Sequence, residues 1–141
     1  KAGVDHLEPL LREKAAFEDK GAVMIATGEG DIHDIGKNIV ALLLRNHGFR
    51  VIDLGKDVPA DRILETAERE RPDVIGLSAL MTTTMVRMKE VISLAREGKT
   101  AGHFILGGAV VTRSFAESLG AAYARDGVEA VRVITGLISK K

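Results

Sequence analysis

Ala22-Val23-Met24-Ile25-Ala26-Thr27 is a short apolar run of the kind that forms a buried strand. It is followed by the turn Gly28-Glu29-Gly30, by Asp31-Ile32-His33-Asp34-Ile35-Gly36, and by a helical pattern from about Gly36 to Asn46. A strand, a loop and a helix in this order predict the start of an open α/β sheet, which binds its ligands at the carboxyl ends of the strands. The loop that carries His33 is therefore the first candidate site.

The rest of the chain repeats this alternation of strands and helices. Continuous apolar strands separated by helices of about ten residues imply a parallel sheet covered on both faces. A doubly wound, flavodoxin- or Rossmann-like α/β fold with five parallel strands in the order 2-1-3-4-5 is the natural expectation. The predicted strands are 22–27, 50–54, 74–78, 104–106 and 121–124, and the predicted helices are 36–46, 59–70, 85–95, 112–119 and 128–138.

The composition excludes several classes of function. The 141 residues are 45% apolar and only 4% aromatic, which indicates one domain with an aliphatic core. Twenty basic and twenty acidic side chains cancel, so no electrostatic footprint for nucleic acid or an anionic membrane is present. The absence of cysteine excludes disulfides and thiolate metal sites, and is compatible with the cytoplasmic location that we expect. No apolar stretch approaches membrane-spanning length.

His33 has a carboxylate two residues before it. Asp31 is near enough to accept a hydrogen bond from the second ring N–H, which is how a metal-bound histidine is oriented. An isolated Asp-x-His is nevertheless more often a solvated turn, Gly107-Gly108 can simply end a strand, and Thr84 can cap a helix. Neither the dinucleotide nor the Walker glycine pattern is present. Taken one at a time, these features leave the function open.

Polar and glycine-containing segments follow four of the predicted strands. Because the carboxyl ends of parallel strands meet at one edge of the sheet, these segments should form one rim. Glycine pairs allow close approach of a ligand to the backbone, so the rim suggests a long, partly apolar ligand held against the sheet. The segments are 30–33, 78–84, 107–109 and 123–127.

Taken together, the motifs resemble a known family. Asp31-x-His33-x-x-Gly36, then forty-one residues, Ser78-x-Leu80, then twenty-six residues and Gly107-Gly108 are similar to the cobalamin-binding fingerprint of methionine synthase, corrinoid methyltransferase proteins and cobalamin mutases. The likeness extends over residues 21–139. It implies a cobalamin (vitamin B12)-binding domain.

The resemblance implies roles for three residues around the cobalt. The cofactor would be methylcobalamin with its dimethylbenzimidazole displaced, in the base-off, His-on form. His33 would be the lower axial cobalt ligand, and Asp31 would be hydrogen-bonded to its other nitrogen. Thr84 stands where methionine synthases have a serine that extends this pair to a His–Asp–hydroxyl relay. His33, Asp31 and Thr84 are thus the candidate catalytic residues.

The resemblance also implies a pocket for the displaced nucleotide tail. Ser78 and Thr82 would contact the tail beside the Gly107-Gly108 pair, and Asp126 and Gly127 would close the pocket. The expected cofactor-binding residues are Gly30, Asp31, Ile32, His33, Asp34, Gly36, Ser78, Leu80, Thr82, Gly107, Gly108, Asp126 and Gly127.

The N-terminal residues differ from the rest of the chain. Apolar residues at helical spacing predict a helix from about Asp5 to Phe17, and it resembles the last helix of the cap that precedes this domain in methyl carriers. The chain starts at Lys1 and not at Met, so we expect a fragment of a longer polypeptide. Residues 1–20 would be the terminal helix and linker of a truncated cap, and residues 21–141 the cobalamin-binding domain.

Within the family, the methyl carriers are favoured over the mutases. Residues 30–40 and 78–85 resemble the methyltransferase version, and residues 122–131 look most like compact bacterial methionine synthases. The first hypothesis is therefore the methyl-carrying module of methionine synthase, which transfers methyl from methyltetrahydrofolate to homocysteine. Its partners would be the folate, homocysteine and reactivation domains of the same or another polypeptide, and the fragment alone should not turn over.

Three alternatives stay open. The closest is a free-standing corrinoid protein of a methanol, methylamine or methoxyarene methyltransferase system. The second is a cobalamin-dependent light sensor or regulator. The third is a cofactor-free flavodoxin-like domain such as a response regulator.

Overall fold

The computed structural model describes residues 21–28, 35–98 and 102–139, and strands and helices alternate through these ranges. The expected N-terminal helix and the loop with His33 lie outside the described residues. The strands are β1 (Ala22–Thr27), β2 (Arg50–Asp53), β3 (Val74–Ser78), β4 (His103–Gly107) and β5 (Ala122–Tyr123). The helices are α2 (Ile35–Asn46), α3 (Ala60–Glu70), α4 (Thr82–Glu97), α5 (Arg113–Ser118) and α6 (Gly127–Ser139).

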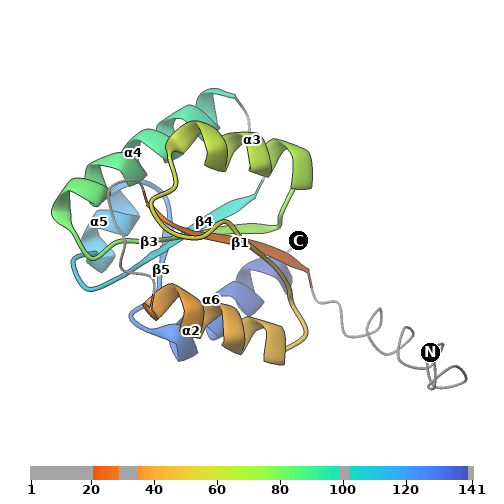
Figure 1. Ribbon diagram of the computed structural model, residues 1–141. Coiled ribbons are helices and arrows are strands. Elements are labelled where there is room, and N and C mark those ends of the chain that lie inside the picture. Colours follow the sequence, from red (N-terminus) through yellow and green to blue (C-terminus); the bar gives the residue numbers. More distant parts are fainter. Residues whose placement is uncertain (1–20, 29–34, 99–101, 140–141) are drawn as a thin grey trace, which may run out of the picture.

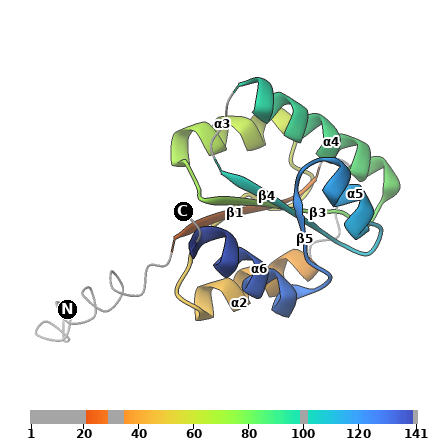
Figure 2. The same ribbon diagram turned by 180° about the vertical axis from the view of Figure 1, so that it is seen from behind.

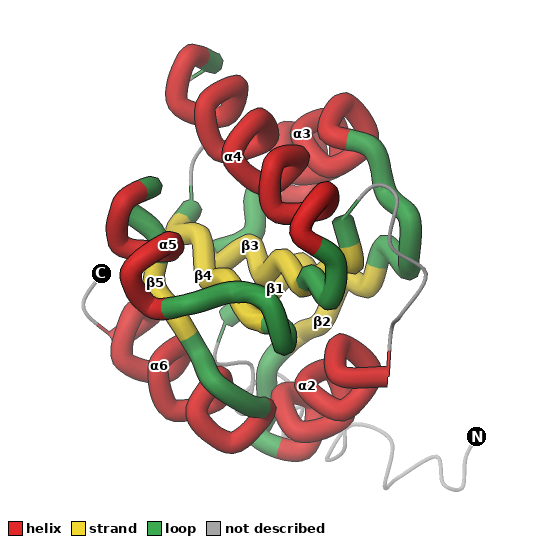
Figure 3. Tube along the Cα trace, turned by 90° about the vertical axis from the view of Figure 1, so that its left-hand side faces the viewer, coloured by secondary structure: helices red, strands yellow, loops and turns green. Residues whose placement is uncertain are grey.

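The five strands form one parallel sheet in the order β2-β1-β3-β4-β5, which confirms the predicted fold class. Figure 3 shows the sheet from its end, between two layers of helices. In β1, Ile25 lies opposite Asp53 of β2 on one side and opposite Gly76 of β3 on the other. The strand order changes direction at β1 and β3, and crevices at such points are where open α/β sheets bind ligands.

Different helices cover the two faces of the sheet. Helices α3, α4 and α5 lie on one face, and α2 and α6 lie on the other (Figures 1 and 2). Strand β1 is buried on both sides, as its unbroken apolar run predicts. Met24 and Ala26 pack into the core beneath α3, α4 and α5. Val23 and Ile25 pack into the second core, beneath α2 and α6.

Local sequence explains where several helices begin. Pro59 precedes α3, where its missing N–H is not needed. Thr112 caps α5 by accepting a hydrogen bond from the Phe115 N–H at 3.1 Å. Helix α4 begins at Thr82, with Met81 in the capping position and no side-chain cap. The interpretation of Thr84 as a helix cap is therefore wrong, since Thr84 lies inside the first turn.

Candidate functional site

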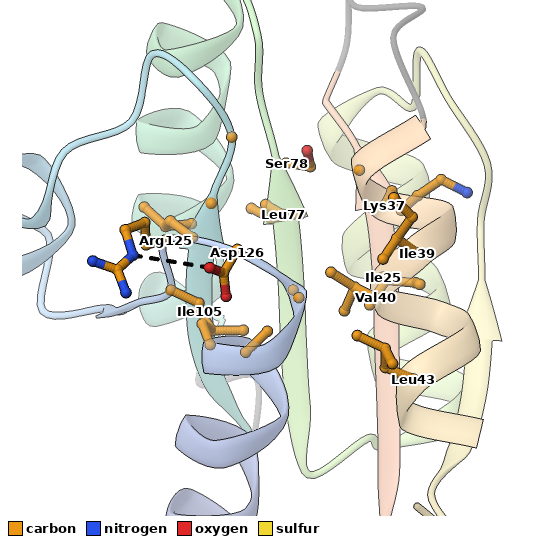
Figure 4. Close-up of a pocket in the computed structure, with 18 of the residues that line it drawn as sticks. Ile25, Lys37, Ile39, Val40, Leu43, Leu77, Ser78, Ile105, Arg125 and Asp126 are labelled. Carbon is orange, nitrogen blue, oxygen red and sulfur yellow. Dashed lines mark ion pairs between the residues drawn. The ribbon is translucent and has the colours of Figure 1, made fainter. Parts of the chain in front are cut away.

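A cavity of about 620 Å³ lies between α2 and α6, above the carboxyl halves of β1, β3 and β4. Its volume falls within the range of ligand pockets, and most of its lining is apolar. The charged residues in the lining are Lys37, Arg125 and Asp126. Figure 4 shows Ile39 and Leu43 of α2 on one side of the cavity, with Arg125 and Asp126 on the other. The cavity suits a large and mainly apolar part of a ligand.

Small residues in the strands create the floor of this cavity. Gly76 lies between Ile25 and Ile105 across three neighbouring strands. A Cβ atom at Gly76 would lie 3.2 Å from Ile25 Cγ2 and 3.5 Å from Ile105 Cγ2, so a side chain here would fill the hollow. Nearer the edge of the sheet, Ser78 lies between Thr27 and Gly107 in the same way. Gly76, Ser78 and Gly107 all lie in the lining and leave room for a ligand directly against the sheet.

Most of the predicted binding residues that can be located line this cavity. Gly30, Asp31, Ile32, His33 and Asp34 lie outside the described residues, so the structure does not place the axial ligand. The chain enters that loop from β1 and leaves it into α2, and both elements border the cavity. The predicted residues in the lining are Gly36, Ser78, Leu80, Gly107, Gly108, Asp126 and Gly127.

The two predicted threonines lie elsewhere. Thr82 is exposed at the start of α4 and is not part of the cavity lining, so the expected contact with the nucleotide tail has no support from the cavity. Thr84 is 0% exposed, two residues further along the helix. It packs against the end of β1, because a Cβ atom at Gly28 would lie 2.6 Å from Thr84 Cγ2. Thr84 therefore adjoins the start of the loop that carries Asp31 and His33.

Two buried hydroxyl groups, one at the end of β1 and one next to it, have no hydrogen-bond partner among the described residues. They belong to Thr27, the last residue of β1, and to Thr84. Buried polar atoms are normally paired, and an unpaired one in a native structure often marks a missing ligand, ion or water. Neither threonine lines the cavity, and both lie where the chain leaves β1, so a partner for either hydroxyl would lie outside the described residues.

The fold itself requires a glycine at position 108. Its φ is +115°, and a Cβ atom would lie 1.9 Å from the Ala79 carbonyl oxygen. Close approach of a ligand was the expected reason for both glycines of this pair, and for Gly108 that explanation is incomplete. At Gly107, a Cβ atom would lie 3.1 Å from the Ala124 carbonyl oxygen. The pair thus also permits tight packing of the loops after β3 and β5.

Asp126 has a local structural role as well. Its Oδ1 accepts a hydrogen bond from the Glu129 N–H at 2.9 Å, and Glu129 Oε1 accepts from the Arg125 N–H at 2.6 Å. This reciprocal arrangement is close to a capping box and fixes the start of α6. Asp126 borders the cavity while its carboxylate caps the helix.

Several lining residues were not predicted from the sequence. Gly76 carried a usable signal, because a glycine inside an apolar strand often marks close approach by a ligand or another backbone. Ile25 and Ile105 looked like ordinary core residues. Other members lie on helical faces whose orientation the sequence did not fix, among them Lys37, Ile39, Val40, Leu43 and Val128.

The described residues limit where a metal could bind. Over residues 21–28, 35–98 and 102–139, no group of three or more His, Asp or Glu side chains is placed to hold a metal ion. A metal carried by a cofactor with its own equatorial ligands needs only one protein ligand, so this result is compatible with the expected single histidine. None of the described helices is both long and apolar enough to cross a membrane.

Comparison with known proteins identifies related chains. The family model of the B12 binding domain matches residues 21–134. Dimethylamine corrinoid protein 3 of Methanosarcina mazei is 43% identical over 133 residues, which cover 92% of this chain and 80% of that protein. Methionine synthase of Mycobacterium tuberculosis is 38% identical over 150 residues, which cover 100% of this chain and 13% of that protein.

A solved structure gives the same result. The methanol:cobalamin methyltransferase complex MtaBC from Methanosarcina barkeri matches with a TM-score of 0.84 and 39% identity, over 87% of this chain and 48% of that one. The fold and the cavity define an α/β domain with room for a large ligand against its sheet. The chain belongs to the B12-binding domain family, and its cofactor is a cobalamin. It spans between 13% and 80% of the length of these relatives.

Proposed function

We propose that the chain is the cobalamin-carrying module of a corrinoid protein in a methylamine or methanol methyltransferase system. Support comes from the dimethylamine corrinoid protein, which is 43% identical and of which the match covers 80%, and from the similarity to the methanol system. Methionine synthase was the first expectation from the sequence. Its lower identity of 38%, over 13% of its length, favours the corrinoid proteins instead.

One observation carries the assignment of the site. The 620 Å³ cavity borders both the strand that precedes the His33 loop and the helix that follows it. A cofactor whose tail occupied the cavity would bring its metal to the carboxyl edge of the sheet, next to that loop. His33 is the lower axial ligand in this proposal, and Asp31 accepts a hydrogen bond from its second nitrogen. Such a partner fixes the tautomer and orientation of a ligating imidazole.

The remaining site residues bind and orient. When bound, the methylcobalamin supplies a cobalt atom that carries the methyl group between partner enzymes. Ser78, Gly107 and Gly108 hold the displaced tail against the sheet, and the start of α6 at Gly127 closes the cavity. The buried Thr84 hydroxyl extends the His33–Asp31 pair, which supplies the partner that it lacks among the described residues. These groups position the imidazole and shield it from water.

Spectroscopy of the Co(II) form tests the proposal. The parent protein loaded with cobalamin should show hyperfine coupling from one axial nitrogen in electron paramagnetic resonance, and His33→Ala should abolish it. His103→Ala is the matched control, because His103 is exposed at the start of β4, at the opposite edge of the sheet. The same nitrogen coupling in His33→Ala as in the parent would refute the ligand assignment.

Methionine synthase stays a second candidate because its likeness covers the whole chain at 38% identity. Methyl-transfer assays separate the two. The methylated holoprotein is offered either homocysteine with a homocysteine methyltransferase domain or the methyl-accepting enzyme of a methylamine system. Faster demethylation by the homocysteine domain would favour methionine synthase over the corrinoid protein that we propose.

A further inference from the structure

Lys37 occupies an unusual position for a charged residue. It is 4% exposed and is the one charged side chain among the buried residues that the structure describes. Its Nζ lies 2.6 and 2.8 Å from the two carboxylate oxygens of Asp53 and 3.0 Å from Asn38 Oδ1. These three acceptors match the three N–H donors of an ammonium group.

Stability alone explains this arrangement poorly. Taking the Lys37 ammonium group out of water costs several kcal/mol. Its partner Asp53 is an exposed residue, and water weakens the attraction that would offset this cost. Lys37 also lies in the first turn of α2, where the helix dipole disfavours a positive charge. Figure 4 shows its ammonium group directed away from the cavity, although other atoms of Lys37 contribute to the lining. The pair therefore needs another explanation.

The end of β2 and the short segment after it contact the chain on both sides of residues 29–34. At the β1 end, the Thr27 N–H donates to the Gly55 carbonyl at 2.9 Å, and the Val58 N–H donates to the Thr27 carbonyl at 3.1 Å. At the α2 end, Lys37 is bound to Asp53, which itself accepts a hydrogen bond from the Gly55 N–H at 2.8 Å. Backbone hydrogen bonds hold the strand, and the ion pair ties the first turn of α2 to this segment.

We propose that Lys37 and Asp53 are positioning residues for the axial ligand, an inference that rests on the proposed function. The ion pair fixes the first turn of α2 relative to the end of β1. It thereby fixes the span that residues 29–34 must bridge and the place where His33 meets the cobalt. The Lys37 ammonium group points away from the cavity, and Asp53 is not among the lining residues. Removal of the pair should loosen axial coordination more than it weakens retention of the cofactor in the cavity.

The decisive variant is Lys37→Met/Asp53→Asn. It removes both charges together, so no unpaired charge is left buried, and such replacements are often neutral for folding. Three quantities are measured at one fixed pH: the urea midpoint of the apoprotein, the cobalamin Kd, and the ratio of nitrogen-coordinated to nitrogen-free Co(II) cofactor. The matched control is Arg87→Met/Glu90→Gln, which removes a half-exposed ion pair of 3.5 Å on α4.

We expect that ratio to fall about tenfold in the double variant, the size usual when a group that orients a metal ligand is lost. The control should keep the parent ratio. A double variant with a lower urea midpoint but the parent ratio would show that the pair serves only folding and would overturn the proposal. If the double variant does not fold, Asp53→Glu is the variant that tests the proposal. It keeps both charges and lengthens the acidic side chain of the ion pair by one methylene. A parent-like ratio in Asp53→Glu would then overturn the proposal.

Failure of the proposed axial ligation by His33, the part of the proposed function on which this inference rests, would look different. In that case the parent itself would bind no cobalamin, or would bind it without an axial nitrogen. The parent then has no axial nitrogen signal with which a variant could be compared. This result is distinct from a parent with the signal and a variant that keeps it.

Discussion

The two faces of the sheet are built for different purposes. Under α3, α4 and α5 the core is closed, and Met88, Ile92 and Leu106 are almost completely buried. Under α2 and α6 the sheet adjoins a 620 Å³ cavity, and Ile39 and Val128 in its lining are 50% and 73% exposed. Protein interiors normally leave few voids larger than a water molecule. One face therefore supplies stability, and the other gives up packing to receive the cofactor.

The origin of this difference lies in a few residues. Gly76 removes a side chain from the middle of the sheet on the cavity face. The opposite face has no such gap at the neighbouring position, where Ile75 is fully buried. At these two neighbouring positions, β3 thus has a bulky side chain toward the closed face and no side chain toward the open face. Substitutions on the two faces should accordingly have different consequences.

The largest expected effect is on the closed face. Ile92→Ala removes a side chain that is 1% exposed in α4 and should lower the free energy of unfolding of the apoprotein by about 2–5 kcal/mol. Leu43→Ala, beside the existing cavity, should cost less than half as much, because fewer packed atoms lose contacts. Urea unfolding of both apoproteins measures this. Equal losses would mean that the two faces do not differ as we describe.

The second effect concerns the glycine pair. Gly108→Ala should destabilise the apoprotein by about 1–3 kcal/mol, since alanine is strained at a φ of +115°. Its Cβ would also collide with the Ala79 carbonyl. Thermal unfolding without cofactor is the measurement. An apoprotein as stable as the parent would show that Gly108 matters only for the ligand.

The third prediction separates cofactor binding from folding. Gly36 lies in α2 and in the cavity lining, and a Cβ atom added to it would meet nothing within 4 Å. Gly36→Leu should therefore leave the apoprotein folded and weaken cobalamin binding at least about tenfold, or about 1.4 kcal/mol. The control is Gly136→Leu in α6, where a Cβ atom also meets nothing within 4 Å and which is not in the lining. Equal cobalamin affinities of the two variants would rule out the cavity as the binding site.

The sheet was the most predictable part of the molecule. Strands such as β1 and β3 contain continuous apolar runs, which only a sheet covered on both faces accommodates, so their limits and order followed from the pattern. Residues whose role depends on contacts across the fold were harder. Lys37 and Asp53 are sixteen residues apart, and nothing local indicates that they pair. The phase of α4 decides which residue of Thr82-Thr83-Thr84 is buried, and the sequence alone left that choice open.

The smallest effect is expected at Thr84, which lies in the first turn of α4 beside the end of β1. Its hydroxyl is buried, with no partner among the residues that the structure describes. Thr84→Val keeps the shape and removes this group, so the apoprotein should become about 1 kcal/mol more stable. Thr135→Val is the control, because the Thr135 hydroxyl already donates to the Val131 carbonyl at 2.7 Å, and its loss should bring no gain.

The holoprotein should respond in the opposite direction. If the Thr84 hydroxyl completes the relay to His33, its removal should lower the ratio of nitrogen-coordinated to nitrogen-free Co(II) cofactor about twofold to fivefold, the equivalent of one neutral hydrogen bond. Asp31→Asn, which removes a charge-assisted bond, should lower it further. Urea unfolding of the apoprotein and electron paramagnetic resonance of the holoprotein measure the two effects. In one outcome, the Thr84→Val apoprotein is more stable than the parent and its holoprotein has less axial coordination. The Thr84 hydroxyl would then serve cofactor binding at a cost in folding stability. An unchanged ratio would leave Thr84 as a packing residue between α4 and β1.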